Sequence, residues 1–278
     1  MTVDLSQVEL DQLDARLRIL LPEQYQESYE SIEPKPMGSA GLKFDAEGKV
    51  AWNEIWQTFC DLAMAGGPPH KGRLLEPATI DAIAANPTQY DAVVDELCRG
   101  IVMASELPAY RAPRDGWIEV HCFSQTMADW LARAIVMENV AASSNGLMLY
   151  LPAAPHFRIE KEIKNVVTVI AKTTHYWVGH MSRSQKVLIA DLFVKMSAES
   201  PLLEPSAGWR GVDCDSVGAA IWMMRALAAH NVLARREEKT LYVAMDERHD
   251  PDGEIVRAML LKVRRLESAA EAQRRRGQ

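Results

Sequence analysis

The sequence predicts an α+β protein in which one folding unit occurs twice. Residues 116–172 align with residues 208–264 without a gap, at a constant spacing of 92, and 16 of the 57 paired positions are identical. Unrelated sequences of ordinary composition would share about 3 or 4 such positions. We therefore predict a tandem duplication of a β-α-β-β-α unit that forms a two-layer, pseudo-symmetric body with helices on one face of the sheet. The strand order across the two copies is left open.

The first half of the unit has clear signals in copy one. A short strand is expected over residues 117–122, and Ser124 is placed to cap the following helix by accepting a hydrogen bond from a free backbone amide. Apolar residues between Met127 and Ile135 then recur at the spacing of one helical face. Asn139 stands where this helix must end, because asparagine tolerates the left-handed conformation found there.

The second half of the unit is predicted from a turn and a second amphipathic segment. Asn145-Gly146 is typical of a tight hairpin turn, and residues 147–151 are expected to form the strand that follows it. A second helix is expected over about residues 159–172. Glu162 falls in its first turn, where a negative charge is favoured by the helix dipole.

The remainder of the chain is predicted to be mainly helical. Helical spacing of apolar residues occurs at 6–21, 52–63, 78–85 and 89–104, and a Gly/Pro loop follows the second of these segments. The predicted organisation has a mainly helical N-terminal region with Gly/Pro loops, a first α+β repeat, a helical linker, a second repeat and a basic tail. Their bounds are 1–110, 111–172, 173–207, 208–268 and 269–278.

The composition excludes several classes of protein. The 278 residues are 48% hydrophobic and 25% charged, as in an ordinary globular protein. The formal net charge of −7 disfavours nucleic acid as a partner, because such binding depends on lysine and arginine neutralising phosphates. The N-terminus lacks a basic start followed by an apolar run, and no stretch approaches the roughly 18 apolar residues of a membrane helix. We therefore expect a cytoplasmic protein with no membrane partner.

The familiar chemical motifs are absent from the sequence. The four cysteines, Cys60, Cys98, Cys122 and Cys214, are widely spaced, which argues against a zinc module or a disulfide framework. We expect them to be reduced, and Cys122 and Cys214 to be small buried side chains rather than reactive thiols. No nucleotide loop, HExxH, nucleophile elbow or EF-hand pattern occurs. No metal site is expected, and the sequence identifies no cofactor.

The duplication separates residues that serve the fold from residues that serve a single site. A position retained in both copies is most simply explained by the shared fold. Arg133 and Arg225 are the exception, because both lie off the apolar stripe and Asp129, a local partner for Arg133, is replaced by Ile221 in copy two. A contact between the copies, or with a ligand at their junction, would explain both arginines.

A stripe of polar residues on the second helix occurs in copy one alone. Its members recur at helical spacing without a carboxylate among them, whereas ordinary solvated faces mix glutamate with lysine. Copy two has Gly253, Val256, Arg257, Leu260 and Arg264 at the first five of these positions. The stripe is either a plain solvated face or an anion-binding face. It consists of Lys161, Lys164, Asn165, Thr168, Lys172 and His175.

Histidines specific to copy one or to the Gly/Pro loop complete the candidate site. The candidate proton carriers are His70, His121, His175 and His180, although each taken singly is also compatible with a structural role. Lys71 and Arg73 flank His70 in the loop and are candidate anion ligands together with Lys161, Lys164, Asn165, Lys172, Arg133 and Arg225. His175 and His180 are five residues apart, about 140° around a helix, so they share a metal only if the helix is broken.

Two functional hypotheses follow. The first is an intracellular metabolic enzyme that binds a carboxylated or phosphorylated small molecule and uses histidine as acid and base. The second is a non-catalytic subunit or assembly factor that binds a protein partner or a second copy of itself through the duplicated body. It is motivated by the helix expected over Val217–Ala229, which is apolar nearly all round apart from Arg225.

Overall fold

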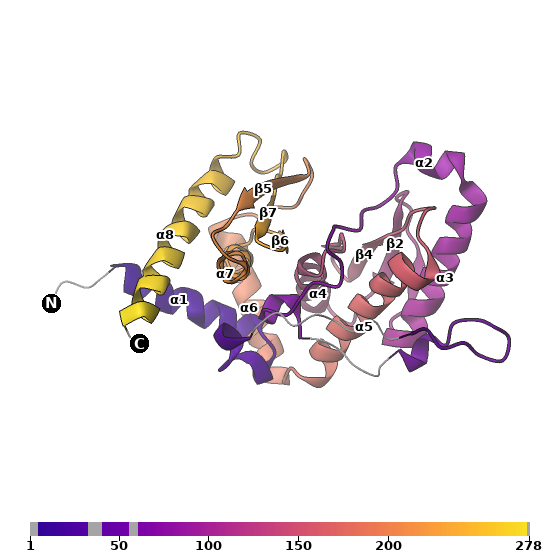
Figure 1. The fold of residues 1–278 in the computed structure, drawn as a ribbon, viewed down its shortest axis with the longest axis horizontal. Helices are drawn as coiled ribbons and strands as arrows, with labels where there is room; N and C mark the ends of the chain where they lie inside the picture. Colours follow the sequence, from indigo (N-terminus) through magenta and orange to yellow (C-terminus); the bar gives the residue numbers. More distant parts are fainter. Residues whose placement is uncertain (1–4, 33–40, 56–60, 277–278) are drawn as a thin grey trace. The chain divides into compact units, whose positions relative to one another are not determined.

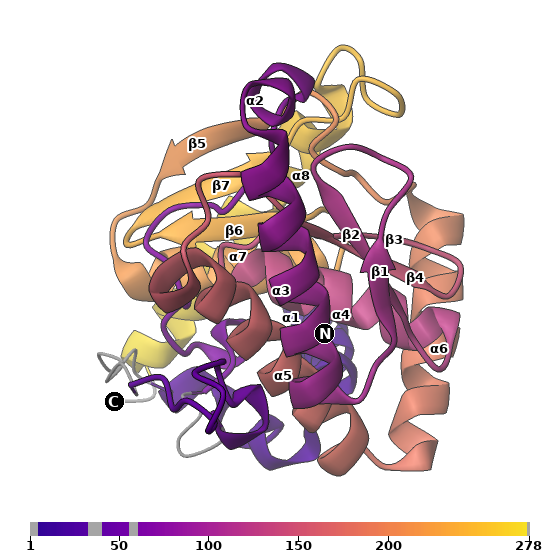
Figure 2. The ribbon, with the colours of Figure 1, turned by 90° about the vertical axis from the view of Figure 1, so that its right-hand side faces the viewer.

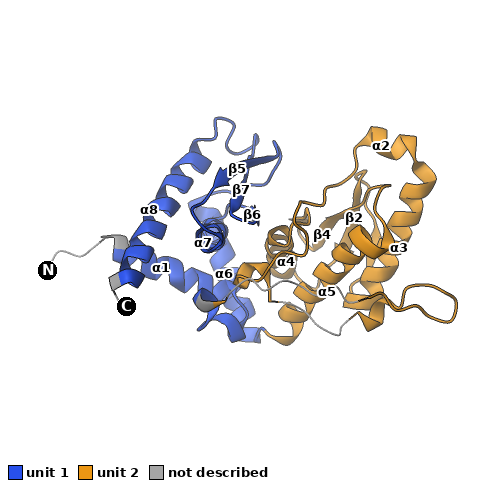
Figure 3. Ribbon diagram, in the orientation of Figure 1, with its two compact units in different colours: residues 1–31, 181–278 blue, residues 32–180 orange. Residues whose placement is uncertain are grey.

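A computed structural model describes residues 5–32, 41–55 and 61–276 (Figure 1). Helices and antiparallel sheets both occur, which confirms the predicted α+β class. The chain divides into two compact units, residues 1–31 with 181–278 (unit 1) and residues 32–180 (unit 2), shown in separate colours in Figure 3. No described helix has both the length and the apolar character needed to cross a membrane.

Unit 2 contains a four-stranded antiparallel sheet with the order β1-β2-β4-β3. Helix α4 packs on β3 and β4, and α5 contacts both α3 and α4. Figure 2 shows α3 running beside this sheet. The strands are β1 (Ala109–Arg111), β2 (Trp117–His121), β3 (Ser143–Asn145) and β4 (Met148–Pro152). The helices are α2 (Ile80–Ala85), α3 (Pro87–Ser105), α4 (Gln125–Met137), the π-helical turn η5 (Ile159–Ile163) and α5 (Lys164–Gly179), with 3-10 turns η3 (Trp52–Glu54) and η4 (Ala63–Ala65).

Unit 1 contains a three-stranded antiparallel sheet with the order β5-β7-β6. Helix α7 lies against β6, β7 and α8, and α1 contacts α6, α7 and α8. The strands are β5 (Trp209–Asp213), β6 (Ala234–Glu237) and β7 (Thr240–Ala244). The helices are α1 (Leu5–Leu20), α6 (Arg183–Glu199), α7 (Val217–Ala228) and α8 (Glu254–Arg276), with 3-10 turns η1 (Glu23–Tyr25) and η2 (Tyr29–Ser31).

The sheets of the two units pair in registers that differ by 92 residues. Trp117 lies opposite Pro152 in unit 2, and Trp209 lies opposite Ala244 in unit 1. The helix caps correspond as well, since Ser124 Oγ accepts from the Met127 amide and Ser216 Oγ accepts from the Ala219 amide. Positive φ angles also recur at equivalent places, at Gly116 and Gly208 before the first strand and at Asn139 and Asn231 after the first helix.

The two left-handed asparagines make equivalent contacts with chain that precedes each sheet. The Asn139 carbonyl accepts from the Leu75 amide at 2.8 Å, and its side-chain nitrogen donates to the Lys71 carbonyl at 2.8 Å. Asn231 likewise accepts from the Leu203 amide and donates to the Ser200 carbonyl, each at 2.9 Å. Each asparagine therefore both ends a helix and anchors a loop, which in unit 2 carries His70 and Lys71.

Two sequence predictions of helices need correction. The segment 52–63 is not one helix, because residues 52–54 form a 3-10 turn and Ile55 is already outside it. Residues 56–60 of the predicted helix, which include Trp56, Phe59 and Cys60, lie outside the described residues. The helix expected over 159–172 instead begins with a π-helical turn and continues as α5 to Gly179.

Candidate functional site

A fully buried ion pair joins the end of α4 to the middle of α5. Lys172 Nζ lies 2.7 Å from Glu138 Oε1, and both side chains are 0% exposed. Glu138 also accepts from the backbone amides of Ala63 at 2.9 Å and His70 at 3.2 Å, and Lys172 Nζ donates to the Asp61 carbonyl at 3.4 Å. Charges removed from water need such partners. The pair therefore fixes both ends of the loop 61–70 against the two helices.

His70 lies at the end of this loop with its imidazole largely enclosed. The Nε2 atom is shielded from solvent and has no hydrogen-bond partner among the described residues. Burial is the main cause that holds the pKa of His70 well below its ordinary value, and the positive charges of Lys172 and Lys164 act in the same direction. The ring is therefore neutral at physiological pH, and a neutral imidazole can accept a proton.

The π-helical turn before α5 places a second carboxylate beside the loop. Glu162 accepts from the Arg158 amide at 3.1 Å and lies 3.5 Å from both Arg158 Nε and Lys71 Nζ. Burial of Glu162 opposes its ionisation, but the hydrogen bonds from Arg158 and the charge of Lys71 keep the pKa of the carboxyl below its ordinary value. Such π-helical turns are rare and are found frequently at functional sites.

These residues form one cluster with an excess of positive charge. We call it the His70 cluster, and it comprises His70, Lys71, Glu138, Glu162, Lys164 and Lys172. With His70 neutral, the cluster has three ammonium groups and two carboxylates, so lysines outnumber acids within it. A site of this composition favours an anion, and its neutral imidazole adds a proton acceptor.

The polar stripe predicted on α5 is divided by depth. Lys161 is exposed, Lys164, Asn165 and Thr168 are half-buried, and Lys172 is fully buried. Thr168 Oγ1 donates to the Lys164 carbonyl at 2.7 Å. The structure thus brings Lys164 and Lys172 close to His70, whereas Lys161 lies in solvent. Arg73, the other cation of the Gly/Pro loop, is also exposed.

The remaining predicted histidines have other neighbours. His121 on β2 packs edge-on against the Tyr110 ring, with centroids 5.1 Å apart, and its Nε2 lies 3.6 Å from Glu119 Oε1. His175 and His180 are both exposed at the C-terminal end of α5, where their Nε2 atoms are 3.1 Å apart. In an unbroken helix the two side chains would point about 140° apart. Because α5 ends at Gly179, His180 lies outside the helix and its ring can contact His175.

Arg133 and Arg225 are each only 4% exposed and have partners within their own units. Arg133 Nη1 donates to the Asp129 carbonyl at 2.9 Å. Arg225 Nη2 donates to the Tyr29 carbonyl at 3.1 Å and its guanidinium lies over the Tyr29 ring. Burial lowers the pKa of Arg225 to about 10.

The described cysteines are not poised as nucleophiles. Cys122 and Cys214 are buried, as expected from the sequence. Burial raises the pKa of Cys122 to about 12, and burial also raises the pKa of Cys214. Both are therefore protonated at neutral pH, and the thiolate is the reactive form.

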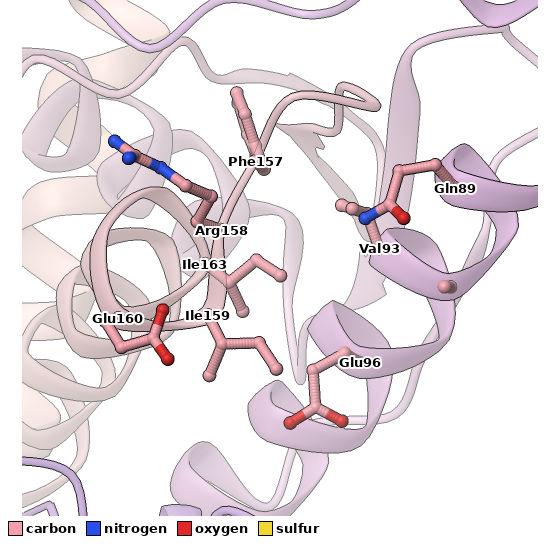
Figure 4. A pocket seen from close by; sticks show the side chains of 9 residues that line it. Gln89, Val93, Glu96, Phe157, Arg158, Ile159, Glu160 and Ile163 are labelled. Atoms are coloured by element: carbon pink, nitrogen blue, oxygen red, sulfur yellow. The ribbon is translucent and has the colours of Figure 1, made fainter. Parts of the chain in front are cut away.

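A small groove lies beside the π-helical turn, between it and α3 (Figure 4). Its volume is about 260 Å³, below the usual range for sites that enclose a drug-sized ligand. Glu96 on its wall is already paired with Arg99 at 2.6 Å and accepts from Trp52 Nε1 at 2.7 Å. The groove contains none of the residues predicted from the sequence. It is lined by Gln89, Ala92, Val93, Glu96, Phe157, Arg158, Ile159, Glu160 and Ile163.

Comparison of the chain with protein-family models, with curated proteins and with solved structures gave no match in any of the three.

Proposed function

We propose that the protein is an intracellular enzyme of small-molecule metabolism that binds a carboxylated or phosphorylated substrate at the His70 cluster. The observation that carries the proposal is the His70 Nε2 atom, which is shielded from solvent and unpartnered among the described residues, beside Lys164 and Lys172. A buried polar atom normally has a hydrogen-bond partner, and a catalytic role is one explanation for an exception.

Each residue type in the cluster has a distinct role in this proposal. Lys164 and Lys71 attract the anion, and exposed Lys161 and Arg73 increase the local concentration of anions by long-range attraction. His70 remains neutral when the site is empty and accepts a proton from the bound substrate. Glu138 and Lys172 are positioning residues, because they hold the His70 backbone and contact no solvent.

His70 is preferred over the other three histidines because of its surroundings. His121 is held between Glu119 and Tyr110, and His175 and His180 contact each other at the opposite end of α5 from Lys164. His121 Nε2 is also shielded and unpartnered among the described residues, but it lies 3.6 Å from the Glu119 carboxylate. His70 combines a shielded ring nitrogen with the positive charges of Lys164 and Lys172.

We further propose that the two units arose by tandem duplication of a β-α-β-β-α ancestor. The shared strand register, the equivalent serine caps and the two left-handed asparagines support this proposal. In the second copy His230 and Arg264 stand at the positions of Glu138 and Lys172, so the buried pair belongs to one copy only. The duplicated fold then serves as the framework, and the His70 cluster is the specialised part.

Binding of simple anions to the whole chain tests the proposal. Calorimetric titration with inorganic phosphate, pyrophosphate and citrate should detect binding of at least one, weakened about tenfold by Lys164→Ala, which removes a charged contact. Substitution His70→Asn should abolish turnover of any substrate subsequently found while leaving the fold intact.

The matched control is Lys262→Ala, which removes a half-buried lysine of α8 in unit 1. Its affinity for the same anions should equal that of the unmodified chain. Failure of all three anions to bind, or equal weakening by Lys164→Ala and Lys262→Ala, would contradict the proposed site. Lys172→Ala is unsuitable for this purpose, because it would leave Glu138 buried and uncompensated and would destabilise the unit.

The alternative is a non-catalytic subunit that binds a partner. The observation that first suggested it no longer supports it, but a different helix does. The apolar helix that motivated it is α7, whose residues from Ala220 to Ala228 are buried within the fold of unit 1. Helix α6 instead exposes Val187, Leu188 and Val194, at 55%, 50% and 73%. Light scattering over a range of concentrations would favour this alternative if the chain self-associates and Val194→Asp disperses it.

A further inference from the structure

We propose that His175 and His180 form a binding site for a divalent first-row transition-metal ion, and that Cu²⁺ is the ion bound most tightly. Their Nε2 atoms are 3.1 Å apart and both side chains are exposed at the C-terminal end of α5. This site is separate from the His70 cluster and does not depend on the function proposed above. The identity of the cation follows from ligand type, because imidazole suits copper, nickel and zinc.

The separation of the two nitrogens fits two ligands of one metal ion. Nitrogen–metal distances of about 2.0–2.1 Å and the observed 3.1 Å between the nitrogens give an angle of about 98° at the metal. That value lies between the square-planar and the tetrahedral angle, the geometries that Cu²⁺ and Zn²⁺ adopt. A single cation that faces both rings would therefore meet each nitrogen at a normal bond length.

The orientation of the rings agrees with this geometry. The ring centroids are 4.9 Å apart, and the ring planes are inclined by 70°. Two imidazoles bound to one metal at that angle would have centroids about 4.8 Å apart. A linear, head-on hydrogen bond between the nitrogens would separate the centroids by about 5.4 Å. The rings are thus bent toward each other, as two ligands of a shared cation would be.

The end of α5 creates the site and favours a cation. His180 is the C-cap residue, with φ −123° and ψ 8°, so its side chain leaves the helical path that would have carried it about 140° away from His175. The carbonyl groups at a helix C-terminus carry partial negative charge, which stabilises a nearby cation.

Two protein ligands make an open site. Among the described residues no three His, Cys, Asp or Glu side chains gather as metal ligands. The remaining coordination positions are thus occupied by water or by a small molecule, which makes the bound ion exchangeable and accessible. An open position of this kind is characteristic of reactive rather than structural metal sites.

Titration of the tag-free, full-length chain with Cu²⁺ alone and with Zn²⁺ alone tests the proposal, with free glycine present to suppress non-specific binding. One equivalent of Cu²⁺ should bind, with an electron paramagnetic resonance spectrum that shows two coordinated nitrogens. His175→Ala and His180→Ala should each weaken binding at least about tenfold. Because both residues are exposed, neither variant should lose stability.

His156→Ala is the matched control, since His156 is another exposed histidine of unit 2. It should bind Cu²⁺ as the unmodified chain does. The proposal is overturned if the two test variants retain the affinity of the unmodified chain, if the spectrum shows fewer than two nitrogens, or if His156→Ala weakens binding equally.

Discussion

The sheets of the two units pair in corresponding registers, but the residues that follow helix α4 in unit 2 and helix α7 in unit 1 differ in charge. In unit 2 Glu138 and Lys172 form a fully buried ion pair, whereas unit 1 has His230 and Arg264 at the corresponding positions. His230 Nδ1 lies 2.7 Å from its own helix carbonyl at Ala226, and Arg264 is exposed. The fold therefore forms without the pair. Because desolvating two charges is costly, the pair in unit 2 is best explained by the loop that it holds, which carries His70.

The largest expected effect comes from breaking this pair. Lys172→Ala leaves Glu138 buried and uncompensated and should lower the free energy of unfolding by about 3–5 kcal/mol. The equivalent change in unit 1, Arg264→Ala, affects an exposed side chain and should stay within about 0.5 kcal/mol. Urea unfolding of both variants measures the difference. Similar losses in the two variants would mean that the units do not differ in this respect.

A double variant separates the loss of the ion pair between Glu138 and Lys172 from the loss of the packing contacts of the two side chains. Glu138→Gln with Lys172→Met replaces the charges by uncharged groups of similar volume, so it should recover most of the stability lost in Lys172→Ala. The same variant should fail to bind anions if the pair positions His70. Full anion binding by a stable double variant would show that the pair has no role in the site.

The glycines before the first strand provide a second matched comparison. Gly116 and Gly208 have φ angles of 81° and 86°, which alanine adopts at a cost of about 1–2 kcal/mol. At Gly116 an added Cβ would also lie 2.5 Å from the Ala78 carbonyl oxygen, whereas at Gly208 nothing lies within 4 Å. Gly116→Ala should therefore lose about 1–3 kcal/mol more than Gly208→Ala, from overpacking. Equal losses in thermal unfolding would contradict this difference.

The pH dependence of stability should also differ when His70 is replaced. The pKa of His70 in the folded state lies well below its ordinary value near 6.5. The unfolded chain therefore binds a proton first as the pH falls, so this contribution is complete above about pH 6.5 and is lost progressively as the pH falls toward the folded pKa. His70→Asn should remove that part of the acid sensitivity. Parallel stability profiles for the two proteins between about pH 7 and 5 would show that His70 is not the cause.

The smallest effects are expected at the helix caps, where the units are alike. Ser124→Ala and Ser216→Ala each remove a hydroxyl that accepts at 3.1 Å from the amide three residues on. Each should cost about 1 kcal/mol of unfolding free energy. Equal values in the two units would support one shared cap, and values that differ by more than about 1 kcal/mol would count against it.

Local chemistry accounts for the elements that the sequence predicted correctly. Serine caps and the left-handed Asn139 depend on neighbouring backbone groups, so the residue types alone indicate them. The hairpin expected at Asn145-Gly146 turns one residue later, because Asn145 ends β3 and Gly146 and Leu147 form the turn. The prediction of a helix over 52–63 was wrong for the residues that the structure describes, because the same spacing of apolar residues also fits a buried turn. Trp52 is 0% exposed in a 3-10 turn, and its indole nitrogen donates to Glu96, a residue far along the chain.

The candidate site was harder to predict than the fold. Helical spacing assigns Lys172 to a polar stripe but contains no information about the loop 61–70 that covers it. Its partner Glu138 lies outside α5, and no local pattern links the two residues. The π-helical turn and the end of α5 at Gly179 also lack a periodic signal, so the burial of Glu162 and the meeting of His175 with His180 are visible only in the structure.

Nuclear magnetic resonance titration of the histidine rings tests the central claim most directly. The His70 signals, assigned by loss in His70→Asn, should show a ring that stays neutral at about pH 6, below the ordinary histidine pKa. The same His70 signals should move when pyrophosphate or citrate is added at neutral pH. A His70 ring that becomes protonated near the ordinary histidine pKa and does not respond to either anion would contradict a shielded, anion-binding imidazole.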